Sequence, residues 1–421
     1  MPPFSFIHTA DLHLDSPFST LARENSDIAS AMRSATFRAF ENIIELCIKK
    51  QVDFLLIAGD VYDGEDRSLR AQIRFRDGLK KLSDAGIAAF VVHGNHDPVG
   101  SWSTSLDWPE NVHIFGDQPE SFQAKRGNEL LAVIHGISYP KRNEKRNLSL
   151  KLKKSDEPAF QIGLLHANAG ANTGHEPYAP CTIEDLKKAN MDYWALGHVH
   201  EKRILSEEGP VIIYPGNSQG RSIRETGEKG CCLINVDESG KIEKEFLSTH
   251  AIRWETAEIQ AGDITAEQEL INRLENKCIE ISENNLSTPV IVRFIITGRG
   301  PLSNIISNPQ TVNDLLEITR DAGISCSPFV WPEKIKTDMS PELDLDTIIN
   351  QEDFAGELLR FSEELTDTDE FENFIKEELS PLFENSRAGK IITVPAKRKL
   401  HSLLKEARNI CMEGLFKEDA K

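Results

Sequence analysis

Five short clusters of polar residues occur in the first half of the chain, and each follows an apolar run. The segments are HTADLHL, LLIAGDVYD, VVHGNHD, IGLLHAN and WALGHVH, in this order. Apolar runs that end in polar loops are typical of buried strands in an α/β sheet, where the loop carries the chemistry. Because the clusters supply Asp, His and Asn, they predict a shared metal site. The candidate residues are Asp11, His13, Asp60, Asp63, Asn95, His96, His166, His198 and His200.

Each cluster taken alone has a simpler interpretation. Asp-x-His can cap a turn beside a buried histidine, and GNHDP contains residues that favour turns. Five clusters in order are much harder to explain in this way. Mixed carboxylate, imidazole and amide ligands suit Mn²⁺ or Fe²⁺ and tolerate Zn²⁺, whereas Mg²⁺ prefers oxygen-rich sites. Two such ions together can activate water against a phosphodiester.

The length of 421 residues predicts two or three domains. We expect an α/β core over residues 1–250 and a small α+β domain over 251–331. Residues 332–421 would form an acidic helical segment followed by a basic amphipathic helix. No apolar stretch approaches the roughly 18 residues of a membrane span, and the N-terminus lacks signal-peptide features. The seven scattered cysteines suit reduced thiols in the cytoplasm.

The net charge of −19 by itself argues against a nucleic-acid-binding protein. However, residues 333–384 contain 17 acidic and 4 basic side chains, so the preceding part is only mildly acidic. Arg67 and Arg70 follow the GDVYD loop and are placed to contact a phosphate near the metals, although they could instead lie on a polar helix surface.

The ordered set D-x-H, G-D-x-x-D, G-N-H-D, a single His and G-H-x-H resembles the calcineurin-like metallophosphoesterase superfamily over roughly residues 5–220. The segment HTADLHLDSPF is especially similar to a bacterial branch of the SbcD-type DNA-repair exonucleases. This resemblance implies a four-layer α/β/β/α sandwich with a small capping domain. It also implies a cytoplasmic, metal-dependent DNA exonuclease.

The resemblance further implies roles for the candidate residues. One ion would be held by Asp11, His13 and His200, the other by Asn95, His166 and His198, and Asp60 would bridge them. His96 would face the scissile phosphate as a general acid or leaving-group stabiliser. Asp63 could orient His96 by a hydrogen bond, and Asp97 would support the loop. Arg221 and Arg224 lie in and after PGNSQGRS, a loop similar to one that lines the cleft in this nuclease family, and would contact the DNA backbone.

Partners are implied as well. SbcD-type nucleases are similar in having C-terminal elements that bind the coiled-coil base of an ABC-type ATPase. The C-terminal helix would therefore either dock such a partner or pack on its own chain. A homodimer formed through helices of the core is also implied. Two other functions remain open: a small-molecule phosphodiesterase or phosphatase on the same fold, and a scaffold without catalysis.

Overall fold

The computed structural model describes residues 1–16, 25–64, 68–100, 106–170, 178–341 and 345–366, with separate positions between 377 and 415. The chain forms two compact units. The first unit contains Met1–Ala257, Glu275–Phe294 and Glu317–Lys334, and the second contains Glu258–Leu274, Ile295–Leu316 and Ile335–Lys421. All the described candidate site residues belong to the first unit.

The first unit contains two six-stranded sheets. In one sheet the order is β12-β11-β1-β2-β3-β4. Its parallel strands are β1 (Phe4–Thr9), β2 (Phe54–Ala58), β3 (Ala88–Val92) and β4 (Val112–Ile114). A hairpin of β11 (Gly230–Val236) and β12 (Ile242–Ser248) completes this sheet, and β11 pairs antiparallel with β1.

The second sheet has the order β5-β6-β7-β8-β10-β9. Its central strands run parallel and are β6 (Glu129–Ile137), β7 (Phe160–His166), β8 (Tyr193–Gly197) and β10 (Val211–Tyr214). The antiparallel edge strands are β5 (Glu120–Arg126) and β9 (Arg203–Ser206). Parallel strands end at a common edge, so each sheet presents several polar loops side by side.

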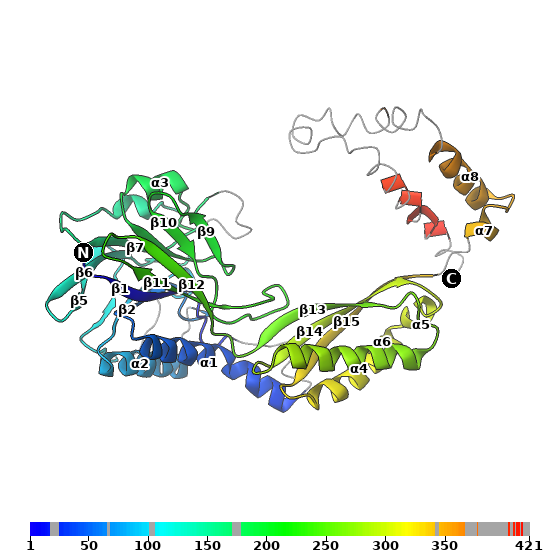
Figure 1. Cartoon of the computed structure of the whole chain (residues 1–421), viewed down its shortest axis with the longest axis horizontal. Helices are drawn as coiled ribbons and strands as arrows, with labels where there is room; N and C mark the ends of the chain where they lie inside the picture. Colours follow the sequence, from blue (N-terminus) through cyan, green and yellow to red (C-terminus); the bar gives the residue numbers. More distant parts are fainter. Residues whose placement is uncertain are drawn as a thin grey trace. The chain divides into compact units, whose positions relative to one another are not determined.

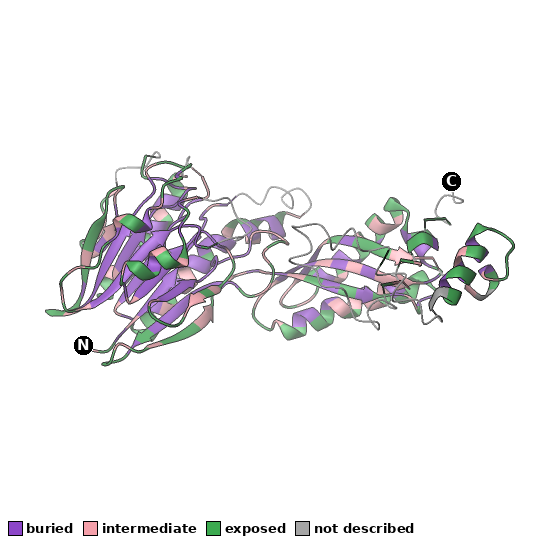
Figure 2. Ribbon diagram, turned by 90° about the horizontal axis from the view of Figure 1, so that it is seen from above, coloured by how far each residue is buried: buried purple, intermediate pink, exposed green. Residues whose placement is uncertain are grey.

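Side-chain alternation along the strands divides the interior into layers. Phe54 and Leu56 of β2 pack between the two sheets together with Ile162 of β7. Leu55 and Ile57 of the same strand face the opposite way and contact the helical layer. The central parallel strands β2, β7, β8 and β10 are consequently buried on both faces, as the continuous apolar runs predicted (Figure 2).

Helices cover the outer faces of both sheets (Figure 1). The first sheet is covered by α1 (Ser26–Lys50) and α2 (Leu69–Asp84), and the second by α3 (Ile183–Lys188). Leu186 of α3 packs with Trp194 of β8 in this outer layer. The predicted four-layer α/β/β/α arrangement is confirmed.

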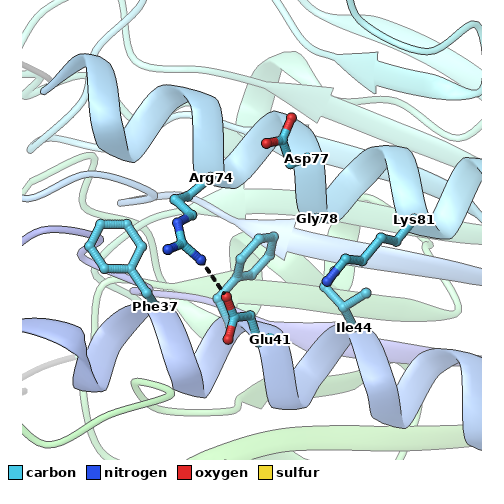
Figure 3. Close-up of a pocket in the computed structure, with 8 residues that line it drawn as sticks. Phe37, Glu41, Ile44, Arg74, Asp77, Gly78 and Lys81 are labelled. Atoms are coloured by element: carbon cyan, nitrogen blue, oxygen red, sulfur yellow. Dashed lines mark hydrogen bonds and ion pairs between the residues drawn. The ribbon is translucent and has the colours of Figure 1, made fainter. Parts of the chain in front are cut away.

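A glycine allows α1 and α2 to pack closely. A Cβ atom at Gly78 would lie 2.4 Å from Cε1 of Phe40, so no larger residue fits without displacing that ring. A pocket opens beside this contact, and Arg74 Nη1 lies 2.9 Å from Glu41 Oε1 across it (Figure 3). None of the candidate site residues lines this pocket, so we assign it a packing origin.

The remaining strands form a third sheet in the order β13-β14-β15. They are β13 (Arg253–Gln260), β14 (Val290–Arg299) and β15 (Val330–Ser340), with α4 (Glu267–Asn284), α5 (Ser303–Ile306) and α6 (Pro309–Ile324) between them. Each of these strands begins in the first unit and ends in the second. The domain limits expected at 250/251 and 331/332 remain predictions.

The second unit also contains α7 (Leu345–Ile348) and α8 (Phe354–Thr366). Met412, from the predicted C-terminal helix, is buried against Ile348, Ala355 and Leu359. That helix therefore packs on its own chain at least at this position. The acidic helical segment expected after residue 332 continues into residues 367–402, which lie almost entirely outside the described part of the chain. None of the described helices combines the length and apolar character that a membrane crossing requires.

Candidate metal centre

The structure brings the five polar clusters together. In the first sheet, Asp11 follows β1, Asp60 follows β2 and Asn95 follows β3. In the second sheet, His166 is the last residue of β7 and His198 follows β8. Because these strands are parallel within each sheet, the loops that carry the clusters share the carboxyl-terminal edges.

Asp11, His13 and His200 form the first group that could hold a metal ion. The Nε2 atoms of His13 and His200 lie 3.2 Å apart, and Asp11 Oδ1 lies 3.9 Å from His200 Nε2. Two nitrogen ligands at about 2.1 Å from a common ion lie roughly 3 Å apart, so the spacing suits a shared cation. The side chains of Asp11 and His13 are fully buried.

Asp11, Asp60 and His166 form the second group, and Asn95 and His198 lie beside His166. His166 Nε2 lies 3.0 Å from Asn95 Oδ1 and 3.4 Å from Asp60 Oδ2. Its Nδ1 lies 2.9 Å from the carbonyl oxygen of Ala58, which accepts the Nδ1 proton and leaves the Nε2 lone pair available to a metal. The ring of His198 lies beside that of His166, with 5.2 Å between centroids.

Asp60 lies between the two groups. Its Oδ2 is 3.4 Å from His166 Nε2 and 3.8 Å from His13 Nε2. Its Oδ1 accepts a hydrogen bond of 2.9 Å from the backbone N–H of His96. One carboxylate oxygen thus faces both sets of imidazoles, which is the position that a bridging ligand needs.

Three motif glycines make room for the His166 ring. A Cβ atom would lie 2.4 Å from His166 Nδ1 at Gly59, 2.8 Å from His166 Cδ2 at Gly94, and 3.0 Å from His166 Nδ1 at Gly197. At Gly197 it would also lie 1.8 Å from the carbonyl oxygen of Ala58. The glycines of three separate motifs therefore all leave space for the His166 ring.

We expect Gly94→Ala to disturb Asp60 and His166 together, because the new Cβ atom would lie 2.3 Å from Asp60 Oδ1. Overpacking of this kind typically costs 1–3 kcal/mol, so calorimetry in EDTA should show a lower unfolding temperature. Divalent-cation binding should weaken as well. Gly64→Ala is the matched control, since no atom lies within 4 Å of its Cβ position. Wild-type unfolding and cation binding in Gly94→Ala would contradict the steric argument.

Four of the candidate ligands adopt a left-handed backbone. Their φ angles are 52° at Asp11, 44° at His13, 48° at Asp60 and 106° at His198. Such angles are uncommon outside glycine, although Asp, Asn and His are enriched among the exceptions. Backbone hydrogen bonds of 3.0 Å, from Asp11 N to Gly59 O and from His13 N to Asp60 O, hold two of these turns. Positive φ in non-glycine residues is typical of functional loops.

Asp97 supports the loops, as expected. It is fully buried, and its Oδ1 accepts a hydrogen bond of 2.7 Å from the backbone N–H of Gly94. Its Oδ2 accepts one of 2.9 Å from the N–H of Val61 and lies 2.9 Å from His93 Nδ1. A single carboxylate therefore ties the GNHD loop to the GDVYD loop.

His96 lies at the accessible rim of the site. Its side chain is 32% exposed, and its ring packs beside that of His13 with 4.9 Å between centroids. Its Nδ1 is 3.7 Å from Asp63 Oδ1, which is longer than the expected hydrogen bond. Asp63 Oδ1 instead lies 2.8 Å from His13 Nδ1 and 2.6 Å from Arg221 Nη1. His13, Asp63 and His96 also form a third group that could hold an ion.

Glu225 is a site residue that the sequence did not reveal. Its Oε1 lies 2.7 Å from His200 Nδ1, and its Oε2 accepts a hydrogen bond of 2.7 Å from the backbone N–H of Arg221. Burial alone would raise the pKa of Glu225, but the hydrogen bond to His200 and the charge of Arg221 hold it below its usual value. The four-residue spacing to Arg221 was the available signal, and this spacing is common.

The predicted DNA-binding arginines have different surroundings. Arg221 is only 20% exposed, and its guanidinium contacts two acidic side chains of the site. Arg224 is exposed on the same loop. Arg70 is exposed on α2, with its guanidinium 5.0 Å from the centroid of an aromatic ring of α1. Arg67 lies outside the described residues, and the DNA contacts remain predictions.

Burial dominates the protonation of the site. It raises the pKa of Asp60 to about 7, with a further increase from the charge of a neighbouring aspartate. Burial and the charge of Asp60 also raise the pKa of Asp11. Burial lowers the pKa of His166 to about 3 and that of His13 well below its usual value. The imidazoles of His166 and His13 are therefore neutral, which is their metal-binding form, and the two carboxylates would be stabilised as anions by a cation.

Comparison with known proteins identifies the family. A profile described as "Calcineurin-like phosphoesterase" matches residues 4–202, and one described as "Metallophosphoesterase YhaO, middle domain" matches residues 254–340. The chain is 36% identical over 345 residues to the "Uncharacterized metallophosphoesterase YhaO" of Bacillus subtilis (strain 168), covering 82% of this chain and 84% of that protein. The chain belongs to the calcineurin-like metallophosphoesterase family.

This metallophosphoesterase also has more distant relatives. It is 29% identical over 249 residues to "DNA double-strand break repair protein Mre11" of Aeropyrum pernix, covering 56% of this chain and 58% of that protein. It is 25% identical over 267 residues to the protein of the same name from Thermoplasma acidophilum, covering 59% of this chain and 66% of that protein. Calcineurin-like phosphoesterases bind divalent metals, and the buried carboxylates and facing imidazoles of this chain fit such ions.

Cation binding by this metallophosphoesterase should strengthen as pH rises. The raised pKa of Asp60 means that the folded metal-free protein favours the protonated carboxyl, so its stability falls as pH increases from about 4 towards about 7. A cation requires the carboxylate and displaces this proton. Thermal unfolding with and without Mn²⁺ should therefore show a stabilisation that grows between pH 5.5 and 8. A shift that is independent of pH would contradict this assignment.

Proposed function

We propose that this metallophosphoesterase is a two-metal DNA nuclease that degrades DNA from its ends during DNA repair. The observation that carries the proposal is the meeting of ligand-type side chains from both sheets beside the accessible His96. DNA as the substrate is supported by the relatives that are named DNA double-strand break repair proteins. The SbcD-like segment HTADLHLDSPF supports the same branch.

Seven residues would hold the ions. One ion would be bound by Asp11, His13 and His200, the other by Asn95, His166 and His198, with Asp60 as the bridge. When bound, the ions would supply a hydroxide nucleophile and neutralise the phosphoryl oxygens. We propose Mn²⁺ because imidazole, amide and carboxylate ligands are mixed here, while Fe²⁺ and Zn²⁺ remain compatible with the same ligands.

His96 would protonate or stabilise the leaving oxygen. The hydrogen bond from its backbone N–H to Asp60 Oδ1 fixes the loop, and the neighbouring His13 ring supports the imidazole. Its Nδ1 lies on the side of Asp63, which leaves Nε2 for the substrate. A third of the side chain remains accessible, so a phosphodiester can reach it without rearrangement of the core.

Degradation of end-labelled linear duplex DNA by the purified protein with Mn²⁺ tests the proposal. We expect digestion of linear DNA that disappears in His96→Ala, and little digestion of a closed circular duplex. Cleavage of bis-nitrophenyl phosphate with intact DNA would instead favour the small-molecule phosphodiesterase or phosphatase. Inactivity on both substrates, with bound metal, would favour a scaffold.

We also propose that the C-terminal part docks a coiled-coil ABC-type ATPase. Large apolar side chains are exposed there, with Phe354 66%, Phe361 54% and Ile410 67% exposed. Met412 packs the C-terminal helix against α7 and α8, so these exposed side chains belong to one small helical cluster. Exposed aromatic and aliphatic side chains on a small helical element are suited to a partner helix.

Co-purification with the ATPase subunit tests this docking. Phe361→Asp should abolish it, whereas Leu286→Asp, at an exposed leucine in the turn after α4, should not. Unimpaired co-purification of Phe361→Asp would exclude this surface. The homodimer also belongs to the proposal, and sedimentation analysis of the isolated protein should give twice the chain mass.

A further inference from the structure

Arg221 joins two carboxylates at the side of the metal centre. Its Nη1 lies 2.6 Å from Asp63 Oδ1, its backbone N–H donates to Glu225 Oε2 at 2.7 Å, and its Nη2 lies 3.6 Å from Glu225 Oε1. Ser16 Oγ donates to Asp63 Oδ2 at 2.7 Å, and Asn217 Nδ2 donates to Glu225 Oε2 at 3.0 Å. We call Asp63, Arg221 and Glu225 the carboxylate–arginine brace.

The brace contacts two imidazoles of the first metal group. Asp63 Oδ1 lies 2.8 Å from His13 Nδ1, and Glu225 Oε1 lies 2.7 Å from His200 Nδ1. A carboxylate favours a protonated nitrogen beside it, so a neutral ring at either position would carry its proton on Nδ1. The two Nε2 lone pairs then face each other at 3.2 Å, an arrangement that a cation between them stabilises.

We propose that Arg221 is a positioning residue for one of the two metal ions: by joining Asp63 to Glu225, it fixes the orientation of His13 and His200. This inference rests on the proposed ligand set of the metal centre. Arg221 then acts through the imidazoles and has no contact with the ion. It also differs from the DNA contact expected from the sequence, because its guanidinium is already used within the protein.

The other metal group is held in a different way. His166 Nδ1 faces the carbonyl oxygen of Ala58, and the glycine positions 59, 94 and 197 enclose its ring. The side chain of His166 is fully buried, whereas those of the brace residues are 14–20% exposed. The metal position at His166 therefore depends on a backbone carbonyl and tight packing, and the position at His13 and His200 depends on a partly exposed polar network. Loss of this network should selectively weaken the binding of the ion held by His13 and His200.

Two effects of removing Arg221 have opposite signs. Loss of its positive charge would by itself strengthen cation binding nearby. Loss of the outer contacts that orient metal-binding histidines typically weakens metal affinity by 10–100-fold. If Arg221 positions the imidazoles, the second effect dominates and affinity falls. The direction of the change therefore separates a positioning role from a purely electrostatic one.

Equilibrium dialysis of the full chain against buffered free Mn²⁺, with metal analysis by mass spectrometry, tests the proposal. We expect two ions per chain in the wild type and in Arg224→Gln, an exposed arginine on the same loop. Arg221→Gln should keep one ion at wild-type affinity and bind the other 10–100-fold more weakly. Wild-type or tighter binding of both ions in Arg221→Gln would overturn the inference.

Arg221→Lys separates charge from geometry. A lysine keeps the charge, but its single ammonium cannot reproduce the planar, forked contacts of a guanidinium with two carboxylates. We expect this variant to bind the ion at His13 and His200 as weakly as Arg221→Gln does. Thermal unfolding in EDTA will show whether the variant is folded. Wild-type Mn²⁺ affinity in Arg221→Lys would mean that charge alone matters, and would overturn the positioning role.

The same titration distinguishes other failures. If Arg221 served DNA directly, Mn²⁺ binding would be unchanged, while DNA affinity and its salt dependence would both fall in Arg221→Gln. That result would overturn the inference and leave the metal centre intact. A wild-type chain that binds fewer than two ions would refute the proposed metal centre itself.

Discussion

Asp60→Asn is expected to weaken the binding of both metal ions together. Asp60 Oδ2 faces His166 Nε2 at 3.4 Å and His13 Nε2 at 3.8 Å, so the substitution removes negative charge from both positions. A two-metal centre supplies several kcal/mol of transition-state stabilisation, and each 1.4 kcal/mol is a factor of ten in rate. Phosphodiester hydrolysis should therefore fall by about 10³-fold or more.

Metal analysis after dialysis gives the decisive measurement for Asp60→Asn. Asp84→Asn is the matched control, since its side chain is 65% exposed at the end of α2. The control should retain wild-type metal content and activity. If Asp60→Asn lost a single ion and held the other normally, the bridging role would have to be withdrawn.

His96→Ala should abolish turnover and leave the metal content unchanged. Loss of a general acid typically costs 10²–10⁴-fold in rate. The cost should be smaller for bis-nitrophenyl phosphate than for DNA, because a nitrophenolate leaves without protonation. Hydrolysis rates of DNA and bis-nitrophenyl phosphate under the same conditions therefore test whether His96 protonates the leaving group.

A different result for His96→Ala would identify a different role. His13, Asp63 and His96 offer ligand atoms within 4.8 Å of one another. Loss of a metal ion in His96→Ala would assign His96 to that group as a ligand. Equal losses of activity on both substrates would argue against protonation of the leaving group.

The α/β core and the meeting of the clusters could be predicted because both follow from periodic signals. A strand such as Phe54–Ala58 is apolar at every position, and Asp60 follows its end directly. Parallel strands deliver such ends to one edge, so local sequence is enough to bring Asp11 and Asp60 together. The meeting of the five clusters depends on this one rule, whereas the four-layer arrangement was implied by the family resemblance.

The contacts around the ligands could not be predicted in the same way. Asp63 and Arg221 are 158 positions apart, and no periodicity links their loops. The family resemblance implied a hydrogen bond between Asp63 and His96, whereas the short contacts of Asp63 are with His13 and Arg221. The role of Glu225 could not be predicted because an acidic residue four positions after an arginine is common. Polar contacts between distant loops depend on the final fold.

The left-handed turns at Asp11, His13, Asp60 and His198 have a consequence for how such a protein could change over evolutionary time. Each non-glycine residue in a sparsely populated backbone region costs roughly 1–3 kcal/mol. Glycine at position 60 would relieve the backbone strain and remove the bridging carboxylate, and asparagine would remove the buried charge and weaken metal binding. A descendant that no longer needed hydrolysis could therefore gain stability by losing its ligands first. The chemistry of this fold would be lost more easily than the fold itself.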